Sequence, residues 1–361
     1  MNAPMLSTPA VSVVMSVLDG ERFLHTAVES ILGQSFGDIE FIIVDDGSGD
    51  RTASMLDSYE RLDSRVRVCH QENRGLVESL NRACALARGK YIARMDADDI
   101  AVRDRLGWQV DFMEKHPEVA ALGGSVELID ATGRTIRIAK FPLKNWEIQR
   151  ALLETCALCH PTVIMRRDVL LSVNGYRRVV VDAEDYDLWL RIAERHQLAN
   201  LKQVVLKYRV HSSQISVRRC RQEGLSGLAA RTAASSRRTG RPDPLTSVES
   251  ITPASLSALG VSEAVQQAAL SREYLRCIRN MYRAREYSVA LAALDMLRGF
   301  DLKKIDNWVV ADFHLWAARL HWRQRRFIKS VLSGGRALIK RPIILGRPIK
   351  LVVTKLNQGR G

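Results

Sequence analysis

Aspartates gather in two short segments of the sequence, and each segment directly follows an apolar run. The first segment is DDGSGD, beginning with Asp45 and Asp46 after IEFIIV, and the second is MDADD, with Asp96, Asp98 and Asp99 after YIAR. Carboxylate oxygens are the ligands that Mg²⁺ and Mn²⁺ prefer. The alternation of Asp96 and Asp98 suits two ligands that reach one divalent ion through a short turn. Such an ion would bind a diphosphate and stabilise the charge that develops on it as a leaving group.

Each acidic segment also has an ordinary structural explanation. For either segment considered by itself, this explanation accounts for the residues as well as a metal site does. Asp-Asp-Gly-Ser after a strand is a common turn sequence, and Asp-Ala-Asp-Asp can begin a helix as its N-cap. A calcium-binding EF-hand loop is excluded for the second segment. Counted from Asp96, the sixth position is Ala101, where that loop needs a glycine for its sharp turn.

The apolar runs before these segments are short and rich in β-branched residues, which is typical of buried parallel strands. Strands are predicted at Val11–Val17, Ile39–Val44, Arg65–Cys69 and Tyr91–Arg94, and helices at Glu21–Leu32, Thr52–Leu62 and Leu76–Ala87. This alternation predicts an α/β fold with a mostly parallel sheet that has helices on both faces. Ligands of such sheets bind outside the carboxyl ends of the strands, which is where the acidic segments fall.

After residue 100 the alternation is less regular. Helices are predicted at 106–115 and 185–195, strands at 119–123 and 204–210, and a hairpin over 126–138 that turns at 131–133. Residues 237–253 are rich in Arg, Pro, Ser and Thr, a composition typical of a linker. Helical patterns follow at 262–300 and 307–328, so the C-terminal region is predicted to be α-helical.

Positive charge is concentrated near the C-terminus. The formal net charge is +14, and twelve Lys and Arg but no Asp or Glu lie from Phe313 to Gly361. Such an excess attracts nucleic acid, anionic lipid or phosphorylated substrates. A nucleic-acid-binding protein is the rival class, but no helix-turn-helix, RNP or zinc-finger signature accompanies the charge. Basic and apolar residues are interleaved from Arg319 to Leu356, which suits an anionic membrane surface or, alternatively, a solvated basic tail.

The sequence predicts a cytoplasmic protein with reduced thiols. Its six cysteines show no regular spacing, and the first apolar run lacks the basic flank of a signal peptide. No run reaches the ~18 apolar residues of a spanning helix. The segment Cys156-Ala-Leu-Cys159-His160 matches the pattern for haem attachment. That chemistry needs export, and a zinc site usually needs a second ligand pair, so both interpretations are rejected.

Three segments, in order, resemble family 2 of the inverting glycosyltransferases, which have the GT-A nucleotide-sugar fold. They are VSVVMSVLDGERFLHTAVESILGQSF, IEFIIVDDGSGDRT and NRGLVESLNRACALARGKYIARMDADDI. The resemblance covers about residues 11–110 and continues more weakly to about 215. It implies a Rossmann-like sheet of the GT-A type. It also implies transfer of a sugar, with inversion, from a nucleoside diphosphate sugar to an acceptor hydroxyl.

The resemblance, together with the composition, predicts the domain organisation. Residues 1–236 are expected to form the catalytic domain, with a nucleotide-binding half over about 1–100 and an acceptor half over about 101–236. A linker over 237–256, a helical region over 257–328 and a basic tail over 329–361 are expected to follow.

The resemblance also assigns nucleotide-sugar contacts to the ends of the first strands. Ser16 and Asp46, with its neighbour Asp45, match positions that hold the base and ribose. Asn73 or Arg74 matches a further contact of this kind.

The second acidic segment matches the DxD motif of the family. The resemblance implies that Asp98 is the better metal ligand and that Asp96 lies nearer the ribose. It also implies that His211, in YRVH, can reach the metal or the diphosphate. One departure concerns the end of the first strand, where Leu18-Asp19 replaces the common Tyr-Asn. It affects the expected nucleotide contacts there and leaves the expected fold unchanged.

A catalytic base is expected at the start of the helix predicted over 185–195. An inverting transfer needs a carboxylate that takes the proton of the attacking hydroxyl. The spacing alone slightly favours a structural explanation, in which Glu184 and Asp185 complement the helix dipole and Asp182 is the N-cap. The resemblance favours Asp185 as the base, with Glu184 as the second candidate. Trp189 is expected in the core or stacked on an acceptor sugar, and His160 is expected to be structural or part of an acceptor loop.

Two further alternatives are weighed against this interpretation. A catalytically inactive scaffold homologue is disfavoured because the acidic residues of the motifs are present, and a nucleotidyltransferase would usually show a Gly-rich basic loop near the N-terminus. The expected partners are a nucleoside diphosphate sugar, a glycan or lipid-linked acceptor and an anionic membrane surface, but not nucleic acid. We expect a role in bacterial surface polysaccharide or lipid-linked glycan synthesis, peripheral on the inner face of the cytoplasmic membrane.

Overall fold

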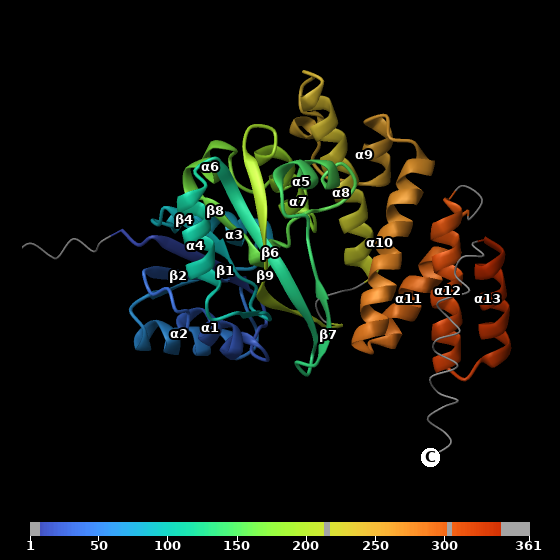
Figure 1. The fold of residues 1–361 in the computed structure, drawn as a ribbon, viewed down its shortest axis with the longest axis horizontal. Coiled ribbons are helices and arrows are strands. Elements are labelled where there is room, and N and C mark those ends of the chain that lie inside the picture. The colour runs from blue at the N-terminus through green and yellow to red at the C-terminus, as the bar shows by residue number, and fades with distance from the viewer. Residues whose placement is uncertain (1–7, 213–216, 302–304, 341–361) are drawn as a thin grey trace, which may run out of the picture. The chain divides into compact units, whose positions relative to one another are not determined.

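A computed structural model describes residues 8–212, 217–301 and 305–340 of the chain. The chain divides into two compact units. The first comprises Met1–Arg209 and Ala229–Ser250, and the second comprises Val210–Leu228 and Ile251–Gly361. The first unit contains the sheet, and the second is built mainly from helices (Figure 1).

The N-terminal half of the first unit alternates strands and helices, as the sequence predicts. The strands are β1 (Val11–Val17), β2 (Ile39–Asp45), β3 (Val66–His70) and β4 (Tyr91–Arg94), and the helices are α1 (Leu24–Leu32), α2 (Thr52–Leu62) and α3 (Leu76–Leu86). Every residue of β2 is buried, because helices cover both faces of a sheet of this kind. Figure 1 shows α1 and α2 below β1 and β2, and α3 above them.

The remaining strands extend the sheet with the opposite pairing. They are β5 (Ile100–Ala101), β6 (Val119–Asp130), β7 (Thr135–Ala139), β8 (Ile164–Arg166) and β9 (Gln197–Val210). The order is β3-β2-β1-β4-β8-β6-β9-β5, and β7 pairs with β6. Pairing is parallel from β3 to β4 and antiparallel from β4 through β8 to β6. The predicted α/β fold is confirmed, and the first four strands pair in parallel.

The segment between β4 and β5 contains the second acidic motif and is held at both ends. Strand β4 is paired with β1 on one side and β8 on the other. Strand β5 pairs with β9, so that Ile100 lies opposite Lys207. Residues 95–99 therefore form a short connection between two paired strands, which restricts where their side chains can lie.

Short helices complete the first unit. They are α4 (Arg105–Lys115), α5 (Asn145–Ala151), η1 (His160–Thr162), α6 (Arg167–Ser172), α7 (Glu184–Ile192) and η2 (Pro244–Ser247). The sequence predicts α4, α7 and the β6–β7 hairpin. It does not predict α5, α6 or β8, which have only 7, 6 and 3 residues. Elements of this length are too short to show a hydrophobic period.

The helical region predicted near the C-terminus is confirmed. Its helices are α9 (Pro253–Ala258), α10 (Glu263–Ala284), α11 (Tyr287–Arg298), α12 (Asn307–Arg323) and α13 (Phe327–Lys340). The ring of Tyr282 contacts those of Tyr287 and Trp316, with centroids 5.5 and 5.3 Å apart, and joins α10, α11 and α12. Within the described residues, no helix combines the length and the apolar character needed to cross a bilayer.

Two longer helices were not predicted from the sequence. Helix α8 (Val217–Arg238) contributes to both units, and it was not predicted because Gly224, Ser226 and Gly227 interrupt its apolar period. Helix α13 forms within the segment expected as the basic tail. The rest of that expected tail, residues 341–361, lies outside the described residues.

A buried carboxylate joins the first two strands to the segment before β4. Glu40 on β2 accepts hydrogen bonds from Ser12 Oγ at 2.6 Å, from the Arg88 backbone N–H at 2.8 Å and from Arg88 Nε at 2.9 Å. Burial would raise the pKa of Glu40, but these bonds and the charge of Arg88 outweigh it and hold the pKa below its ordinary value. The carboxylate therefore stabilises the fold in its charged form.

Glu40→Gln is expected to lower the free energy of unfolding at pH 7 by about 1–3 kcal/mol, because the amide leaves buried donors unmatched. The folded pKa lies below the unfolded value of about 4.3. The contribution of the carboxylate is therefore complete above that value and is lost as the pH falls through the lowered pKa. Urea titrations of both proteins at several pH values should show their difference shrinking under acid conditions. The exposed Glu249→Gln is the control, and an equal effect of both substitutions would contradict the prediction.

Candidate active site

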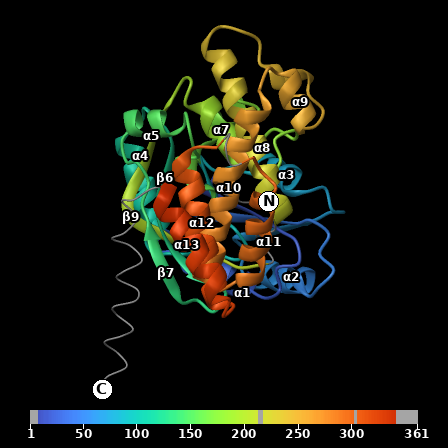
Figure 2. The same ribbon diagram turned by 90° about the vertical axis from the view of Figure 1, so that its right-hand side faces the viewer.

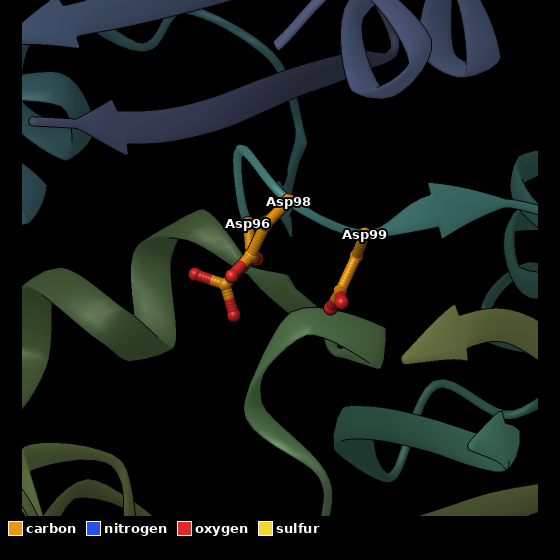
Figure 3. A group of neighbouring side chains, drawn as sticks. All are labelled: Asp96, Asp98 and Asp99. Atoms are coloured by element: carbon orange, nitrogen blue, oxygen red, sulfur yellow. The ribbon is translucent and has the colours of Figure 1, made fainter. Parts of the chain in front are cut away.

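Three aspartates converge in the turn after β4. Asp96, Asp98 and Asp99 each offer a carboxylate oxygen, and these oxygens lie within 4.8 Å of one another. Figure 3 shows their side chains leaving the turn on the same side. The predicted cluster of Asp96 and Asp98 at the carboxyl end of β4 is therefore present, and Asp99 is an additional member.

Asp99 is the most deeply buried of the three. Its Oδ1 accepts a hydrogen bond from the Arg209 backbone N–H at 2.7 Å, and Arg209 Nε donates to the Asp98 carbonyl at 2.7 Å. No donor from the part of the chain that the structure describes reaches Asp99 Oδ2, which is buried. Burial and the charges of Asp98 and Asp96 raise the pKa of Asp99 well above its ordinary value. A divalent cation between these carboxylates would bind the unmatched oxygen and offset the repulsion, so the residues fit a hard cation such as Mg²⁺ or Mn²⁺.

A buried arginine links the acidic turn to the start of α7. Arg94, the last residue of β4, is 1% exposed, and its Nη2 lies 2.7 Å from Asp96 Oδ1. Burial would lower the pKa of Arg94, but the charges of Asp96 and Glu184 oppose this effect and the pKa is raised. Arg94 therefore stays a cation that interacts with acidic residues from two elements. The sequence signal for it was a charged residue at the end of an otherwise apolar strand.

The two candidate bases at the start of α7 have different surroundings. Glu184 is buried, and burial together with the charge of Asp185 raises the pKa of Glu184 to about 8. His160 lies beside it, with Nδ1 3.7 Å from Glu184 Oε1, and its Nε2 lies 2.9 Å from the Tyr176 hydroxyl. Asp185 is only partly buried, and the Cys156 thiol donates to its Oδ2 at 3.7 Å. Glu184 therefore holds a proton more readily than an exposed glutamate does, and Asp185 is the more accessible carboxylate.

Asp45 and Asp46 are buried and fix the loops around them. Asp46 Oδ1 accepts from Gln71 Nε2 at 2.7 Å and from the Arg74 backbone N–H at 2.8 Å, while its Oδ2 accepts from the Gly75 backbone N–H at 2.8 Å. Asp45 accepts from the Ser48 backbone N–H at 3.1 Å and from His70 Nδ1 at 2.8 Å. Their expected contact with a nucleotide stays a prediction.

Gly47, between these loops, has a φ of 83°, and a Cβ at this position would lie 2.9 Å from the Asn73 backbone nitrogen. Only glycine fits this left-handed conformation and this close approach without strain. The turn after β2 therefore packs directly against the 71–75 loop.

The other predicted nucleotide contacts lie near the carboxyl end of β1 or in the loop after β3. Ser16 is a partly exposed residue near the end of β1, and Asn73 and Arg74 are exposed in the loop. Arg74 and Glu184 line the same cavity of about 510 Å³, whose walls are formed by residues 74–78 and parts of 178–184. The structure thus brings the loop after β3 and the start of α7 to one space.

Two further expectations concern residues outside this cluster. Trp189 is fully buried, so it belongs to the core and cannot stack on an acceptor sugar in this conformation. His211 belongs to the second unit, and its expected contact with a metal or a diphosphate stays a prediction.

Residues 12–173 match the family described as Glycosyl transferase family 2. The O-antigen biosynthesis glycosyltransferase WbnJ of Escherichia coli is 34% identical over 207 residues, which cover 56% of this chain and 80% of that protein. The amylovoran biosynthesis glycosyltransferase AmsE of Erwinia amylovora is 32% identical over 212 residues, which cover 58% of this chain and 79% of that protein.

A solved structure shares the fold. It is the mannosyltransferase PcManGT from Pyrobaculum calidifontis in complex with GDP-Man and Mn²⁺, with a TM-score of 0.51 and 18% sequence identity. The match covers 92% of this chain and 86% of that one. At this identity the likeness concerns the fold alone.

Asp99→Asn is expected to stabilise the protein in EDTA, because the amide removes repulsion and can keep its oxygen toward the Arg209 N–H. A gain of about 1 kcal/mol would raise the melting temperature by roughly 2–4 °C. The same substitution should remove most of the stabilisation that added Mn²⁺ gives, since a cation-binding carboxylate is lost. Thermal melts with EDTA and with MnCl₂ measure both effects.

The exposed Asp104→Asn, at the start of α4, is the matched control and should change neither value. A lower melting temperature of Asp99→Asn in EDTA, with an unchanged response to Mn²⁺, would show that Asp99 only supports the fold.

Proposed function

The chain belongs to glycosyltransferase family 2, and on this premise we propose that it transfers a sugar with inversion, assisted by a divalent cation. It is a glycosyltransferase with the GT-A fold predicted from the sequence. The proposed donor is a nucleoside diphosphate sugar, and the proposed acceptor is a hydroxyl of a glycan or lipid-linked glycan. The observation that carries the metal-assisted mechanism is the acidic turn, where three carboxylates offer oxygens within 4.8 Å of one another. Asp99 Oδ2 is buried there without a hydrogen-bond donor among the described residues.

We propose that Asp98 and Asp99 hold Mg²⁺ or Mn²⁺ and that Asp96 lies toward the ribose. When bound, the cation would neutralise charge that develops on the diphosphate as it leaves. Mn²⁺ is named with the solved mannosyltransferase of the same fold, which supports a cation requirement. Arg94 keeps Asp96 in place through their ion pair at 2.7 Å, so the carboxylates need not move when the donor binds.

Asp185 is proposed as the general base. The acceptor oxygen forms a bond to the anomeric carbon as the bond from that carbon to the diphosphate oxygen breaks, and the hydroxyl proton passes to Asp185. Glu184 is less suited to this role because it is buried and its pKa is about 8. A protonated carboxyl cannot accept the proton. Glu184 is instead proposed to position the start of α7 beside Arg94 and His160.

The donor is proposed to bind at the carboxyl ends of β1 and β2, where it would contact Ser16, Asp46 and the 71–75 loop. Arg74 supports this assignment, because its cationic side chain lines the same cavity as Glu184. A nucleoside diphosphate in this space would find a positive group for its phosphates near the start of α7.

A role in bacterial surface polysaccharide or lipid-linked glycan synthesis is proposed from the relatives named for O-antigen and amylovoran biosynthesis. We propose that the protein works at the inner face of the cytoplasmic membrane. Nucleoside diphosphate sugars are cytosolic metabolites, and an acceptor carried on a lipid would be reached most easily from that surface.

Removal of the cation is expected to abolish transfer. A panel of nucleoside diphosphate sugars, assayed for released nucleoside diphosphate with Mn²⁺ or Mg²⁺ present, should identify a donor that is used. EDTA should stop the reaction, and Asp98→Ala should lower the rate to background while the exposed Asp104→Ala retains it. Full activity in excess chelator would exclude the proposed metal role.

Asp185→Asn should lower the catalytic rate by ~10² to 10⁴, the usual contribution of a positioned acid–base group. Donor binding, measured by calorimetry, should stay close to that of the wild type because the amide has the same shape. Glu184→Gln resembles the protonated residue and should retain far more activity. The reverse order, with Glu184→Gln the slower enzyme, would assign the base to Glu184.

A further inference from the structure

Helix α13 exposes its large apolar side chains and buries its small ones. Successive residues of a helix are offset by about 100° around its axis, which divides α13 into three sectors. Ser330 and Ala337 form the buried sector, with Gly334 partly buried beside them. The widest sector is exposed and apolar, and Ile328 and Ile339 within it are 79% and 80% exposed. An ordinary surface helix of a globular protein has the opposite arrangement: its large apolar residues face the protein core, and its polar residues face water.

The small residues of α13 pack against α12. Ala337 contacts Ala311 and Leu315 in an apolar cluster, and Ser330 Oγ donates a hydrogen bond to the Ala318 carbonyl at 2.8 Å. Figures 1 and 2 show the two helices lying side by side. This packing, to which Leu338 also contributes, fixes which sector of α13 faces α12 and leaves the other large apolar side chains of the helix exposed.

The exposed apolar sector continues onto the end of α12. Trp322 is exposed, and its ring lies 4.9 Å from that of Phe327. We define the α13 patch by the exposed apolar residues of both helices: Trp322, Phe327, Ile328, Val331, Leu332 and Ile339. Contiguous exposed apolar groups of this kind usually mark an interaction surface.

Cations border the α13 patch along its length. Lys329, Arg336 and Lys340 are exposed and form the third sector of the helix, next to the apolar one. Seven Lys and Arg, and no Asp or Glu, lie from Arg319 to Lys340. A second copy of the same face would bring these like charges together, whereas an anionic partner would match them.

We propose that the α13 patch docks on the surface of an anionic lipid bilayer. An interfacial helix lies in the plane of the membrane with its apolar side among the acyl chains and its cations level with the lipid phosphates. The three sectors of α13 provide this arrangement, and Trp322 has the amphipathic ring favoured at that depth. With 14 residues, α13 is about 21 Å long, too short to span a hydrocarbon core of about 30 Å. The helix would therefore dock without crossing.

Co-sedimentation of the full chain with lipid vesicles tests this proposal. Vesicles of phosphatidylcholine alone should bind little protein, and those with about 30% phosphatidylglycerol should bind it, more weakly as salt rises from about 0.1 to about 0.5 M. Ile328→Ser with Leu332→Ser should weaken binding about tenfold or more. Circular dichroism should show that the variant keeps its helices, because both side chains point away from α12.

Two matched variants separate the contributions. Leu62→Ser with Ile138→Ser removes two exposed apolar residues of the first unit and should bind vesicles like the wild type. Lys329→Gln with Arg336→Gln and Lys340→Gln should remove most of the salt dependence. Because binding is measured without any donor, these results are independent of the proposed transferase reaction.

Four outcomes would overturn the proposal. The first is wild-type binding by the Ile328 and Leu332 variant. The second is equal binding to neutral and anionic vesicles, or no binding to either. The third is concentration-dependent dimerisation that the same variant abolishes, which would assign the α13 patch to a second copy of the chain. The fourth is loss of vesicle binding in a chain that ends at Lys340, which would assign the binding to residues 341–361.

Discussion

Repulsion between carboxylates at the end of β4 is the constraint on which the rest of the first unit depends. Asp96, Asp98 and Asp99 lie together where burial makes each negative charge costly. The chain offsets part of this cost with a buried cation, Arg94, and with the backbone N–H of Arg209. Among the residues that the structure describes, none donates a hydrogen bond to Asp99 Oδ2. Folding alone therefore leaves part of the negative charge uncompensated. A bound cation would neutralise it.

The change of strand direction in the sheet places this charge at an accessible edge. Parallel strands β3, β2, β1 and β4 all end on one side. The next strand, β8, runs the other way, so the segment before it, which includes His160, lies beside the end of β4. His160 also lies beside Glu184, which links the segments after β4 and around α7. Arg94 lies at this boundary and interacts with acidic residues from both segments. The site is thus a product of topology as much as of the residues that form it.

Much of this could be predicted from the sequence, because short apolar runs and acidic segments have clear local patterns. The strands up to β4 and the pair Asp96 and Asp98 were located in this way. The environment of Glu184 was not, since its raised pKa depends on burial among residues far apart in the chain. Helix α13 was also missed, because its basic residues and exposed apolar side chains resemble an irregular tail until the packing of Ala337 on α12 is seen. Long-range contacts, and not composition, decide both cases.

The way Asp46 holds the loop after β3 has a consequence for how new specificities could be built on this scaffold. Two of its three hydrogen bonds come from main-chain N–H groups, those of Arg74 and Gly75. Any residue except proline can supply such a donor. The side chain at position 74 can therefore be exchanged without loss of these hydrogen bonds, whereas position 75 should stay glycine because its φ is 86°. A library randomised at positions 73 and 74 would retain a folded parent scaffold while sampling different shapes and charges at the mouth of the cavity.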